Sequence, residues 1–562
     1  MRWKIKNQIN KTSSKDRLKQ IQSVLLKNRG ITKKEDIKNF LHPKNPLDIS
    51  PKEVGINLTH LKNSLQRIKQ AIKEEQQIII FGDYDADGIT ATAILWETLN
   101  KLGAKVLPFI PHREKHGYGL SKVAINDLIT SQKPQLIITV DNGIVAHDAA
   151  KYIKKLNIDL IITDHHVVSK TLPTALAIIQ TTKLAGAGVA WIFSKEIIKF
   201  LSDENQISSL DTLDLATIGT IADQVSLTEY NRSIVKKGLN NLSQTKRVGL
   251  LELFSQADFD PSQINSYHIN FIIAPRINAM GRLAHGLDSL RLLCTKNPKR
   301  AISLSKSLNT TNQSRKDLTF ELLNMAKSMV EKPKDKLIII NHKDFHEGVI
   351  GLVAGKLTET HHRPSIVIGI GKDISKASAR SISGVNVIEL IRKAEHLLIN
   401  AGGHPMAAGF SINTANIDAF KKELTDIANK NIEDKLLIPE ISIECELKLS
   451  DISWKLFKLI TQFEPFGMGN RKPIFAIRKV KIIEKYQIGK EKNHLKLILP
   501  SEVKNQTKID ALWFSHGQDK SKILNNMDLA FTIDKNVWNN ITSLQLMIKD
   551  VGQPIDQTKN SQ

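Results

Sequence analysis

Acidic and imidazole side chains stand directly after four short apolar segments of the chain. The segments are residues 78–81, 136–140, 159–163 and 216–222. The side chains that follow them are, in chain order, Asp83, Asp85, Asp87, Asp141, Asp164, His165, His166 and Asp223. Carboxylates and imidazoles without thiolates are ligands that suit manganese, magnesium or another first-row metal ion. The pattern therefore indicates metal-dependent chemistry.

So many carboxylates cannot all stay ionised at close range without a counter-charge. At an effective dielectric constant of about 20, two like charges about 4 Å apart repel each other by about 4 kcal/mol. Divalent cations remove this repulsion, and two metal ions about 3.5–4 Å apart are the usual arrangement for hydrolysing phosphoesters. A calcium loop over 83–88 is disfavoured, because the glutamate of an EF-hand is absent and the segment follows a strand pattern.

The segments that carry these residues alternate with helical patterns. The run 78–81, for example, is followed by a turn rich in acids and glycine and then by helical spacing from Ile89 to Leu102. Such alternation predicts a mainly parallel sheet with helices on both faces. The loops at the carboxyl ends of parallel strands open into one crevice. We therefore expect the acids and histidines to meet at one edge of this sheet.

Patterns in the rest of the sequence predict a long helix and two further domains. Residues 300–332 have the spacing of an amphipathic helix, which Pro333 ends. A second α/β block follows from residue 337 to about 430 and contains the glycine-rich segment 400–404. After about residue 435 the pattern changes to short alternating segments, which are typical of a small β-barrel or sandwich.

Composition bears on the partner and the compartment. The formal net charge is +23, which favours a polyanionic partner, although lysine is abundant throughout the chain. Cys294 and Cys445 lie far apart, which disfavours a disulfide framework or a zinc site and fits a reducing cytoplasm. An apolar run of about 18 residues is absent, and the basic N-terminus has no apolar segment behind it, which disfavours secretion and membrane insertion.

Several segments of the chain resemble the motifs of a known family. The segments around the acids resemble the four motifs of the DHH phosphoesterase superfamily; these segments are 82–88, 141–143, 163–166 and 219–223. Further segments resemble the RecJ family within it, namely 116–121, 184–190, 275–282 and 346–351. Residues 402–409 resemble the signature of a DHHA1 domain, and residues 463–470 resemble the start of an OB-fold.

The resemblance implies a fold and a domain organisation. The fold class is α/β, with a parallel-sheet DHH domain and a DHHA1 domain joined by a long helix, followed by an OB-like β-barrel. The expected parts are an N-terminal helical extension over 1–55, the DHH catalytic domain over 56–295, the interdomain helix over 296–333, the DHHA1 domain over 334–432 and the OB-like nucleic-acid-binding domain over 433–562.

The resemblance also implies an activity. Members of this family degrade single-stranded DNA from its 5′ end and release 5′-mononucleotides by two-metal hydrolysis with Mn²⁺ or Mg²⁺, in DNA repair and recombination. The implied partners are single-stranded DNA, a single-strand-binding protein and a RecQ-type helicase, and the implied form is a cytoplasmic monomer. A sequence with 5% aromatic residues fits binding through phosphates, without reading the bases.

Carried onto this chain, the resemblance assigns roles to particular residues. His166 would assist phosphate binding or proton transfer, and Asp83 would lie at or beside the metals. The implied metal ligands are Asp85, Asp87, Asp141, His165 and Asp223. The implied terminal-phosphate site is Ser378, Arg380 and a turn at Gly402, Gly403 and His404. The implied DNA contacts are Arg113, Lys115, Tyr118, Arg276, Asn278 and Arg282.

Three segments depart from the family pattern. Phe81 stands where some members have a histidine, and residues 177–182 replace an Asn-Pro and a longer loop. Gln224, Val225 and Ser226 follow Asp223 where valine and proline are more frequent.

Two other functions are alternatives to a single-stranded-DNA exonuclease. A pyrophosphatase or a phosphodiesterase for cyclic dinucleotides or short oligonucleotides would use the same metal residues. A non-catalytic replication scaffold is disfavoured, because such proteins lose some of the acids that this chain retains.

Overall fold

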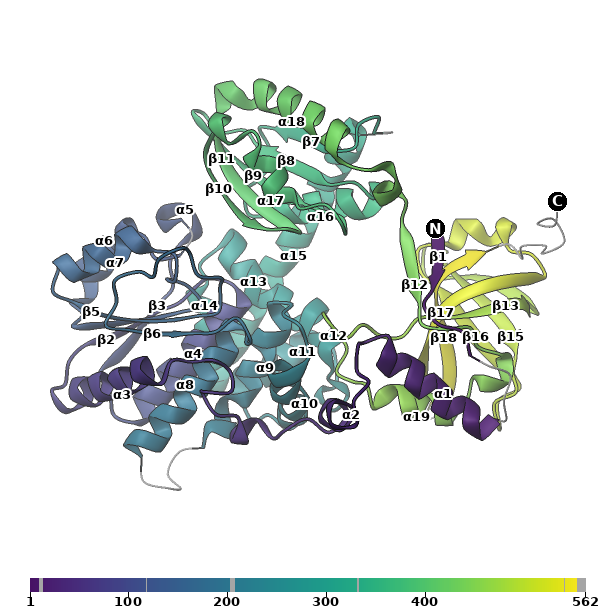
Figure 1. Cartoon of the computed structure of the whole chain (residues 1–562), viewed down its shortest axis with the longest axis horizontal. Coiled ribbons are helices and arrows are strands. Elements are labelled where there is room, and N and C mark those ends of the chain that lie inside the picture. Colours follow the sequence, from purple (N-terminus) through teal and green to yellow (C-terminus); the bar gives the residue numbers. More distant parts are fainter. Residues whose placement is uncertain (10–13, 118, 203–207, 331–332, 540, 553–562) are drawn as a thin grey trace. The chain divides into compact units, whose positions relative to one another are not determined.

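A computed structural model describes residues 1–9, 14–117, 119–202, 208–330, 333–539 and 541–552 (Figure 1). The chain forms two compact units. Residues 45–225 and 230–439 make up one, which we call the central unit. The other, which we call the terminal unit, contains residues 1–44, 226–229 and those from 440 onward. Each is described by itself.

The first part of the central unit is a parallel five-stranded sheet in the order β3-β2-β4-β5-β6. Its strands are β2 (Ile78–Phe81), β3 (Val106–Phe109), β4 (Leu136–Val140), β5 (Asp159–Asp164) and β6 (Ala177–Gln180). The predicted parallel sheet is thereby confirmed. Because β2 has β3 on one side and β4 on the other, the strand order reverses between β2 and β4, where open parallel sheets bind ligands.

Helices cover both faces of this sheet (Figure 1). Residues of α6 and α7 form one apolar core with the sheet. The opposite face carries α3, α4 and α8. The bounds are α3 (Leu58–Lys73), α4 (Ala86–Lys101), α5 (Arg113–His116), α6 (Lys122–Gln132), α7 (His147–Lys155) and α8 (Gly186–Leu201).

A group of helices follows the sheet. The fourth apolar segment, 216–222, is not a strand but lies in a helix that is buried on nearly every side. The long helix begins at Pro298, capped by Asn297, and ends at Met329, close to the predicted range of 300–332. The bounds are α9 (Leu213–Ala222), α10 (Glu229–Leu242), α11 (Val248–Gln256), α12 (Ser266–His268), the π-helical turn Ile269–Ile273, α13 (Ala274–Leu283), α14 (Leu287–Cys294) and α15 (Pro298–Met329).

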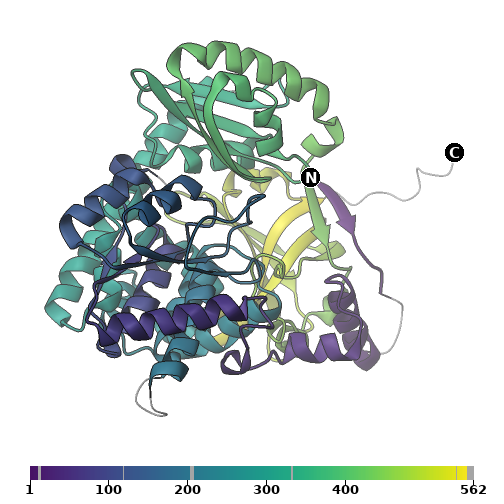
Figure 2. The same ribbon diagram turned by 60° about the vertical axis from the view of Figure 1, so that its left-hand side comes forward.

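The second α/β part of the central unit is a five-stranded sheet in the order β10-β11-β9-β8-β7. Only β7 and β8 are parallel among these strands. The helix α18 lies along this part in Figure 2. The bounds are β7 (Ile338–His342), α16 (Ile350–His361), β8 (Ser365–Gly369), β9 (Ile374–Arg380), α17 (Val387–Arg392), β10 (Leu398–His404), β11 (Ala407–Asn413) and α18 (Ile417–Asn431).

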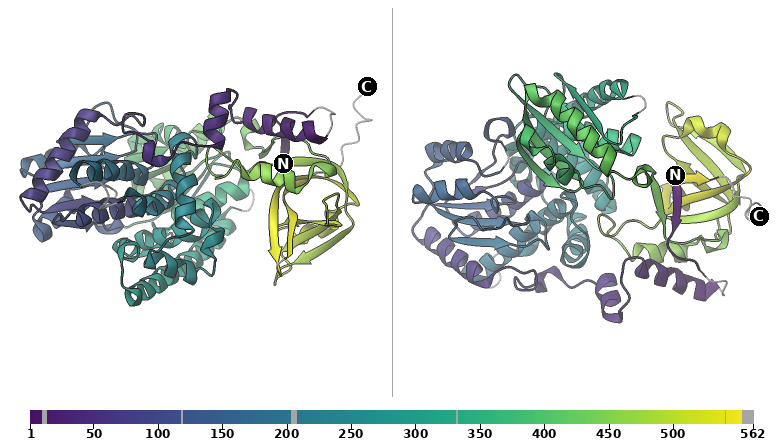
Figure 3. Two further views of the ribbon diagram at one scale, coloured as in Figure 1. Left: turned by 90° about the horizontal axis from the view of Figure 1, so that it is seen from below. Right: turned by 45° about the horizontal axis from the view of Figure 1, so that its top comes forward.

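The terminal unit contains a six-stranded, curved sheet in the order β13-β17-β18-β16-β15-β14 (Figure 3). Its strands are antiparallel except for the pair β16 and β18. Helices α1, α2 and α19 share its apolar core. The bounds are α1 (Ser14–Lys27), α2 (Lys34–Leu41), α19 (Trp454–Thr461), β13 (Phe475–Lys481), β14 (Glu484–Ile488), β15 (His494–Pro500), β16 (Lys508–Trp513), β17 (Asn526–Trp538) and β18 (Ile541–Gly552).

Within the range 1–55, which we expect to be a helical extension, a short strand precedes the helices α1 and α2. Strand β1 (Arg2–Ile5) pairs in parallel with β12 (Glu440–Ile443). Trp3 and Ile5 pack with Ile441 and Ile443 in one small apolar cluster, which explains why the alternating residues form a strand.

Short 3₁₀ segments complete the described elements. They are Pro46–Asp48, Ser209–Thr212, Pro261–Gln263, Glu395–Leu397, Thr414–Asn416, Asp434–Leu437, Leu449–Asp451 and Gly517–Lys522. Among the described helices, none is both long and apolar enough to cross a membrane.

Candidate metal centre

The acids and histidines meet where the strand order reverses. Asp83 follows β2, Asp141 follows β4, and His165 and His166 follow β5, while Asp223 directly follows α9. Their ligand atoms form three overlapping groups, each within 4.8 Å, that could hold a metal ion. The groups are Asp141 with His165 and His166, Asp87 with His165 and Asp223, and Asp83 with Asp85 and Asp141. The structure therefore brings together every acid and histidine to which we assigned metal chemistry.

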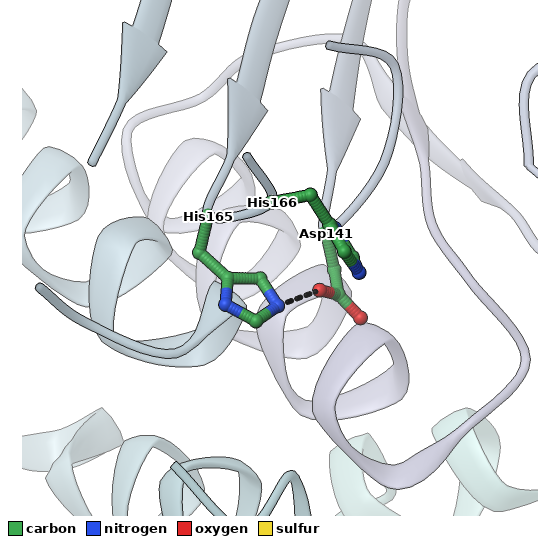
Figure 4. Close-up of side chains that lie close together, drawn as sticks. All are labelled: Asp141, His165 and His166. Carbon is green, nitrogen blue, oxygen red and sulfur yellow. Dashed lines mark ion pairs between the residues drawn. The ribbon is translucent and has the colours of Figure 1, made fainter. Parts of the chain in front are cut away.

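His165 lies at the centre of this cluster. Its Nε2 is 3.1 Å from Asp141 Oδ1, 3.6 Å from Asp223 Oδ2 and 3.9 Å from Asp87 Oδ2. Figure 4 shows its ring directed at the Asp141 carboxylate, with His166 beside them. Both histidines reach the cluster because β5 ends at Asp164, so the chain is already turning and no longer alternates between faces.

Helix N-termini hold two of the carboxylates. Asp85 caps α4, and its Oδ1 accepts hydrogen bonds from the backbone N–H groups of Asp87 and Gly88, both at 3.0 Å. The Asp87 carboxylate accepts hydrogen bonds from Gly186 N at 2.7 Å and Ala187 N at 2.8 Å, at the start of α8. These contacts orient both carboxylates, and the positive ends of the two helices favour their charge.

Asp164 supports His166. Its Oδ1 is 2.8 Å from His166 Nδ1, and its Oδ2 accepts a hydrogen bond from Ile144 N at 2.9 Å. Burial lowers the pKa of His166, but the hydrogen bond and charge of Asp164 outweigh burial and raise it overall. His166 is therefore placed to carry a proton while Asp164 fixes its ring.

Burial and crowding raise the pKa values of the other carboxyl groups. Burial first, and then the charge of Asp85, raises the pKa of Asp83 to about 8 and that of Asp87 to about 7. Burial, with Asp87 and Asp85 nearby, raises the pKa of Asp223 to about 9. Burial and the same neighbours also raise the pKa of Asp141. Without a cation, these carboxyl groups therefore keep their protons to a higher pH than ordinary aspartates do.

Two buried atoms of the described residues have the chemistry of metal ligands. Asp141 Oδ1 and His165 Nε2 are both buried without a hydrogen-bond partner, although they face each other. Burial lowers the pKa of His165 to about 4, so that this nitrogen is an unprotonated lone-pair donor at neutral pH. Asp141 also adopts φ +60°, an uncommon backbone conformation that persists at functional sites. These residues fit a divalent metal ion.

Arginines from four distant segments lie near the cluster. Burial lowers the pKa of Arg282 to about 10, and the nearby charges of Arg113, Arg315 and Arg380 add to this effect. Arg113 stacks over the Tyr84 ring at 5.2 Å, and Arg282 donates to Gly348 O at 3.0 Å. Within the described residues, these four arginines form no ion pair with a carboxylate closer than 4 Å.

Arg315 was not predicted from the sequence. It lies on α15, where Asn312, one turn away and buried, accepts hydrogen bonds from its Nε and Nη2 at 3.2 and 3.0 Å. The only sequence signal is an asparagine three residues before an arginine in a long helix, which does not reveal what the helix faces.

The other residues that we predicted to contact DNA differ in the contacts that they make within the protein. Asn278 Oδ1 accepts a hydrogen bond from Ala86 N at 2.7 Å, so in this structure Asn278 holds the turn between the cluster acids. Arg276 donates hydrogen bonds to Asn309 Oδ1 and to Ile272 O in the π-helical turn. Lys115 forms an ion pair with Asp127. Tyr118 lies outside the described residues.

The expected phosphate turn is instead the end of a strand. Gly402, Gly403 and His404 belong to β10 and pair with Gly409, Ala408 and Ala407 of β11. The segment is extended because its partner residues are small and pair in regular register. On the other side of β11, Gly409 pairs with Ser378 and Ala407 pairs with Arg380. All five predicted phosphate residues therefore lie on one three-stranded patch.

This patch belongs to the neighbourhood of the metal cluster. The rings of His166 and His404 lie 6.4 Å apart and nearly parallel. The Arg380 guanidinium donates a hydrogen bond to Ser378 Oγ at 3.1 Å. The charge of Arg380 also contributes to the lowered pKa of Arg282. An anion bound at the patch would therefore lie close to His166.

An exposed aromatic pair was also missed. Tyr267 and Phe271 are 62% and 66% exposed, and their ring centroids are 4.8 Å apart. They lie in the helical run that continues into α13, which carries Asn278 and Arg282. Their four-residue spacing places both on one helix face, a signal that the sequence offered.

Models of known domain families match three stretches of the chain. The DHH family N-terminal domain matches residues 77–220, the DHHA1 domain matches residues 334–430, and the RecJ OB domain matches residues 443–550. A parallel sheet with an aspartate and histidine cluster at its switch point, followed by a DHHA1 domain, defines a DHH-type protein.

Comparisons with known proteins over most of the chain identify the family within this class. The single-stranded-DNA-specific exonuclease RecJ of Bacillus subtilis is 34% identical, over 98% of this chain and 70% of its own length. The Haemophilus influenzae protein of the same name is 30% identical, over 88% of this chain and 91% of its own length. A Thermus thermophilus RecJ crystal structure with Mn²⁺ aligns with a TM-score of 0.82 and 28% identity, over 98% of this chain and 80% of that one. The chain belongs to the RecJ family.

Proposed function

We propose that this chain is a Mn²⁺- or Mg²⁺-dependent exonuclease specific for single-stranded DNA, which degrades the strand from its 5′ end and releases 5′-mononucleotides. The observation that carries the proposal is the juxtaposition of a buried carboxylate and histidine cluster with arginines that have no carboxylate partner among the described residues. The cluster suits metal ions and the arginines suit a polyanion. The names of the relatives, which are single-stranded-DNA-specific exonucleases, support the substrate.

The proposed metal ligands are Asp85, Asp87, Asp141, His165 and Asp223. Divalent ions bound there would lower the pKa of a water molecule and neutralise charge that develops on the phosphate. Asp83 lies within ligand distance of Asp85 and Asp141, and it would orient or complete this set.

His166 is proposed as the proton carrier. Its raised pKa keeps it protonated to a higher pH than an ordinary histidine, so it can donate a hydrogen bond to a phosphate oxygen or a proton to a leaving oxygen. The buried Asp164 fixes its ring nitrogen and sustains its charge.

The proposed site for the 5′-terminal phosphate is the patch of Ser378, Arg380, Gly402, Gly403 and His404. A guanidinium can bind two phosphate oxygens at once, and strand glycines let an anion approach the backbone. A terminal phosphate held there and a scissile phosphate at the cluster would fix the polarity of degradation. Arg113, Arg276, Arg282 and Tyr118 are the proposed contacts to the following nucleotides.

Digestion of end-labelled strands tests this function. A 5′-labelled oligonucleotide should release its label at once as a mononucleotide, whereas a 3′-labelled one should shorten stepwise, with Mn²⁺ or Mg²⁺ and not with EDTA. A duplex of the same sequence should resist. Faster turnover of pyrophosphate, a cyclic dinucleotide or a dinucleotide than of the long strand would replace this proposal with a small-substrate phosphodiesterase.

The wider setting is part of the proposal. We expect a cytoplasmic monomer that acts in DNA repair and recombination on strands supplied by a RecQ-type helicase and coated by a single-strand-binding protein. Sedimentation of the protein alone and pull-down with a purified single-strand-binding protein test the two associations.

A further inference from the structure

A cavity of about 1040 Å³ lies in the central unit, apart from the metal cluster. Its walls are the last turns of α4, the start of α9, the end of α10 with the loop that leads to α11, and the end of α14 (Figure 1). Among the described residues, none to which we assigned a metal or DNA contact lines it. Ligand pockets in proteins have volumes of about 300–1,000 Å³, so this cavity is large enough for a small molecule.

Two helices separate the cavity from the metal cluster. Helix α4 begins after Asp85 and α9 ends before Asp223, and both of these acids are proposed metal ligands. Farther along the same helices, Glu97 of α4 and Asp214 of α9 line the cavity. A helix rises about 1.5 Å per residue, which places Asp87 and Glu97 about 15 Å apart along α4. A ligand in the cavity would therefore be too far from the cluster to share its metal ions.

The acids that line the cavity already have cationic partners. The Arg247 guanidinium forms ion pairs with Glu97 Oε1 at 2.5 Å and with Asp214 Oδ2 at 3.2 Å, and all three side chains are largely buried. Lys101 Nζ pairs with Asp211 Oδ2 at 2.9 Å. The described lining contains no other acidic side chain.

Three lysines of the lining are not paired in this way. Within the described part of the chain, Lys237, Lys246 and Lys296 form no ion pair with a carboxylate within 4 Å. The described lining carries five basic and three acidic side chains, an excess of two positive charges. Lysine ammonium groups bind phosphate, so this charge suits a ligand with a phosphate group.

The lining also contains groups that suit an aromatic heterocycle. The Trp96 side chain is partly exposed, and an indole ring can stack on a planar base. Asn100, Asn240 and Gln244 are exposed, and their carboxamides can both donate and accept hydrogen bonds at the edge of a base. The cavity therefore combines the two kinds of contact that a nucleotide needs.

We infer that this cavity is a second ligand site of the chain and binds a nucleotide. The phosphates lie at Lys237, Lys246 and Lys296, and the base lies at Trp96 and the exposed carboxamides. Two sources supply this chemistry: the 5′-mononucleotides that the proposed exonuclease releases, and the nucleoside triphosphates of the cell. The inference goes beyond the proposed function, because the site is apart from the metal cluster and needs no metal ion.

The test is the binding of dAMP and of ATP to the full chain, measured by calorimetry in EDTA. Replacement of two lysines at once, Lys237→Gln with Lys246→Gln, should weaken the binding of both nucleotides by about tenfold or more, because each lysine supplies a charged contact to phosphate. Tighter binding of dAMP than of ATP would identify the reaction product as the ligand, and the reverse would identify the triphosphate.

Lys151→Gln with Lys154→Gln is the matched control. Both lysines are exposed on α7, which packs on the face of the parallel sheet opposite α4. The control changes the net charge by the same amount and should bind both nucleotides with an affinity within about twofold of the unmodified protein. Thermal unfolding of both double variants identifies any general loss of folding.

Two variants of Trp96 test the contact to the base. Trp96→Leu should weaken dAMP binding by about fivefold or more, since stacking on one base contributes about 1–3 kcal/mol. Its affinity for inorganic pyrophosphate, which has no base, should stay within about twofold of the unmodified protein. Trp96→Phe keeps an aromatic ring and should retain more of the dAMP affinity than Trp96→Leu does.

The inference is wrong if the unmodified protein binds neither nucleotide at millimolar concentration, or if both lysine pairs affect binding equally. It is also wrong if Trp96→Leu weakens dAMP and pyrophosphate binding equally, or if the Lys237 and Lys246 variant loses affinity for a long oligonucleotide and not for nucleotides. Binding is measured in EDTA, where the proposed exonuclease is inactive. A failure of this inference is therefore distinct from a failure of the proposed function, which requires that the protein with Mn²⁺ does not degrade single-stranded DNA.

Discussion

At the scale of single residues, Asp141 and His165 are the shared members of the cluster. Each belongs to two of the three groups that could hold a metal ion. A residue that belongs to two groups could contribute to metal binding in both, so its loss would disturb both. Asp87 and Asp85 are different, because backbone N–H groups already hold their carboxylates in place.

Asp141→Asn is expected to abolish cleavage and leave the fold intact. Asparagine keeps the size of the side chain and tolerates the positive φ at this position, but it supplies a neutral amide in place of a charged ligand. Turnover of labelled single-stranded DNA should fall by more than about a hundredfold, since even residues that only support ligands cost about 10–100-fold. Gly or Ala at this position would confuse loss of charge with loss of structure.

Asp258→Asn is the control for this variant. Asp258 also has a positive φ, of 52°, but it follows α11 and belongs to none of the metal groups. Its turnover should equal that of the unmodified protein. Near-normal turnover in the Asp141→Asn variant would remove Asp141 from the mechanism.

The protein without metal should lose stability as the pH rises from about 5 to 9. The pKa values of Asp83, Asp87 and Asp223 are about 8, 7 and 9 in the folded chain, against about 4 in an unfolded one. The folded state therefore binds more protons between these values, and the free energy of unfolding falls as pH rises. The stabilisation is complete below about pH 4 and is lost as the pH passes through the folded-state values.

Thermal unfolding in EDTA across this pH range checks the prediction. Added Mg²⁺ should reduce the loss, because a bound cation replaces the protons as counter-charge. The Asp223→Asn variant should show a shallower dependence on pH in EDTA. A midpoint that stayed constant or rose between pH 7 and 9 in EDTA would contradict the raised pKa values.

At the scale of elements, the sequence predicted most of what positions the cluster. Alternation of apolar runs with helical spacing correctly placed β2, β4 and β5, together with the acids that follow them. The segment 216–222 could not be assigned from periodicity, because it is apolar on every side and a buried helix then looks like a buried strand. The glycines at 402–403 suggested a turn, but pairing across β11 makes them extended.

Long-range strand pairing was not predictable from local sequence either. Strand β1 consists of four residues and pairs with a strand more than 430 positions away, so nothing near it in the chain indicates a strand. The arginine cluster is similar, since Arg113, Arg282, Arg315 and Arg380 come from four segments that only the fold brings together.

Gly186→Ala is expected to disrupt the cluster from the start of α8. A Cβ on Gly186 would lie 2.6 Å from Asp141 Oδ1 and 2.7 Å from Asp141 Cβ, while the Gly186 N–H must still reach Asp87. One of the two carboxylates has to move, so Mn²⁺ affinity and turnover should both fall by at least about tenfold.

Gly355→Ala is the matched control, because Gly355 also lies in a helix, α16, and an added Cβ would meet nothing closer than Arg380 Cγ at 3.9 Å. Alanine favours helices by about 1 kcal/mol over glycine, so this variant should be as stable as the unmodified protein or more so. If Gly186→Ala bound Mn²⁺ with normal affinity, the packing of α8 against Asp141 would have no functional role.

At the scale of the whole molecule, the net charge of +23 divides into unlike parts. The metal cluster is acidic and needs cations, whereas the arginines beside it lack carboxylate partners among the described residues. Lysines such as Lys336 and Lys356 form surface ion pairs, which contribute little to stability. The charge that we expect to contact DNA is therefore a small part of the total, at defined positions beside the metal cluster.

Arg315→Ala should weaken DNA binding and reduce its dependence on salt. For single strands, the logarithm of the binding constant falls with the logarithm of salt concentration by about 0.7 for each phosphate that is neutralised. Loss of one contact should therefore make the slope shallower by about 0.7. Binding of a fluorescent oligonucleotide is best measured in the Asp141→Asn background, which prevents cleavage during titration.

Arg300→Ala separates this placed charge from charge in general. Arg300 is exposed in the first turn of the same helix, and its removal changes the net charge by the same amount. Its slope should match that of the parent, since an exposed arginine away from the strand releases few counterions on binding. If both variants reduced the slope equally, overall charge would account for the affinity, and the arginine cluster would lose its special role in holding the DNA backbone.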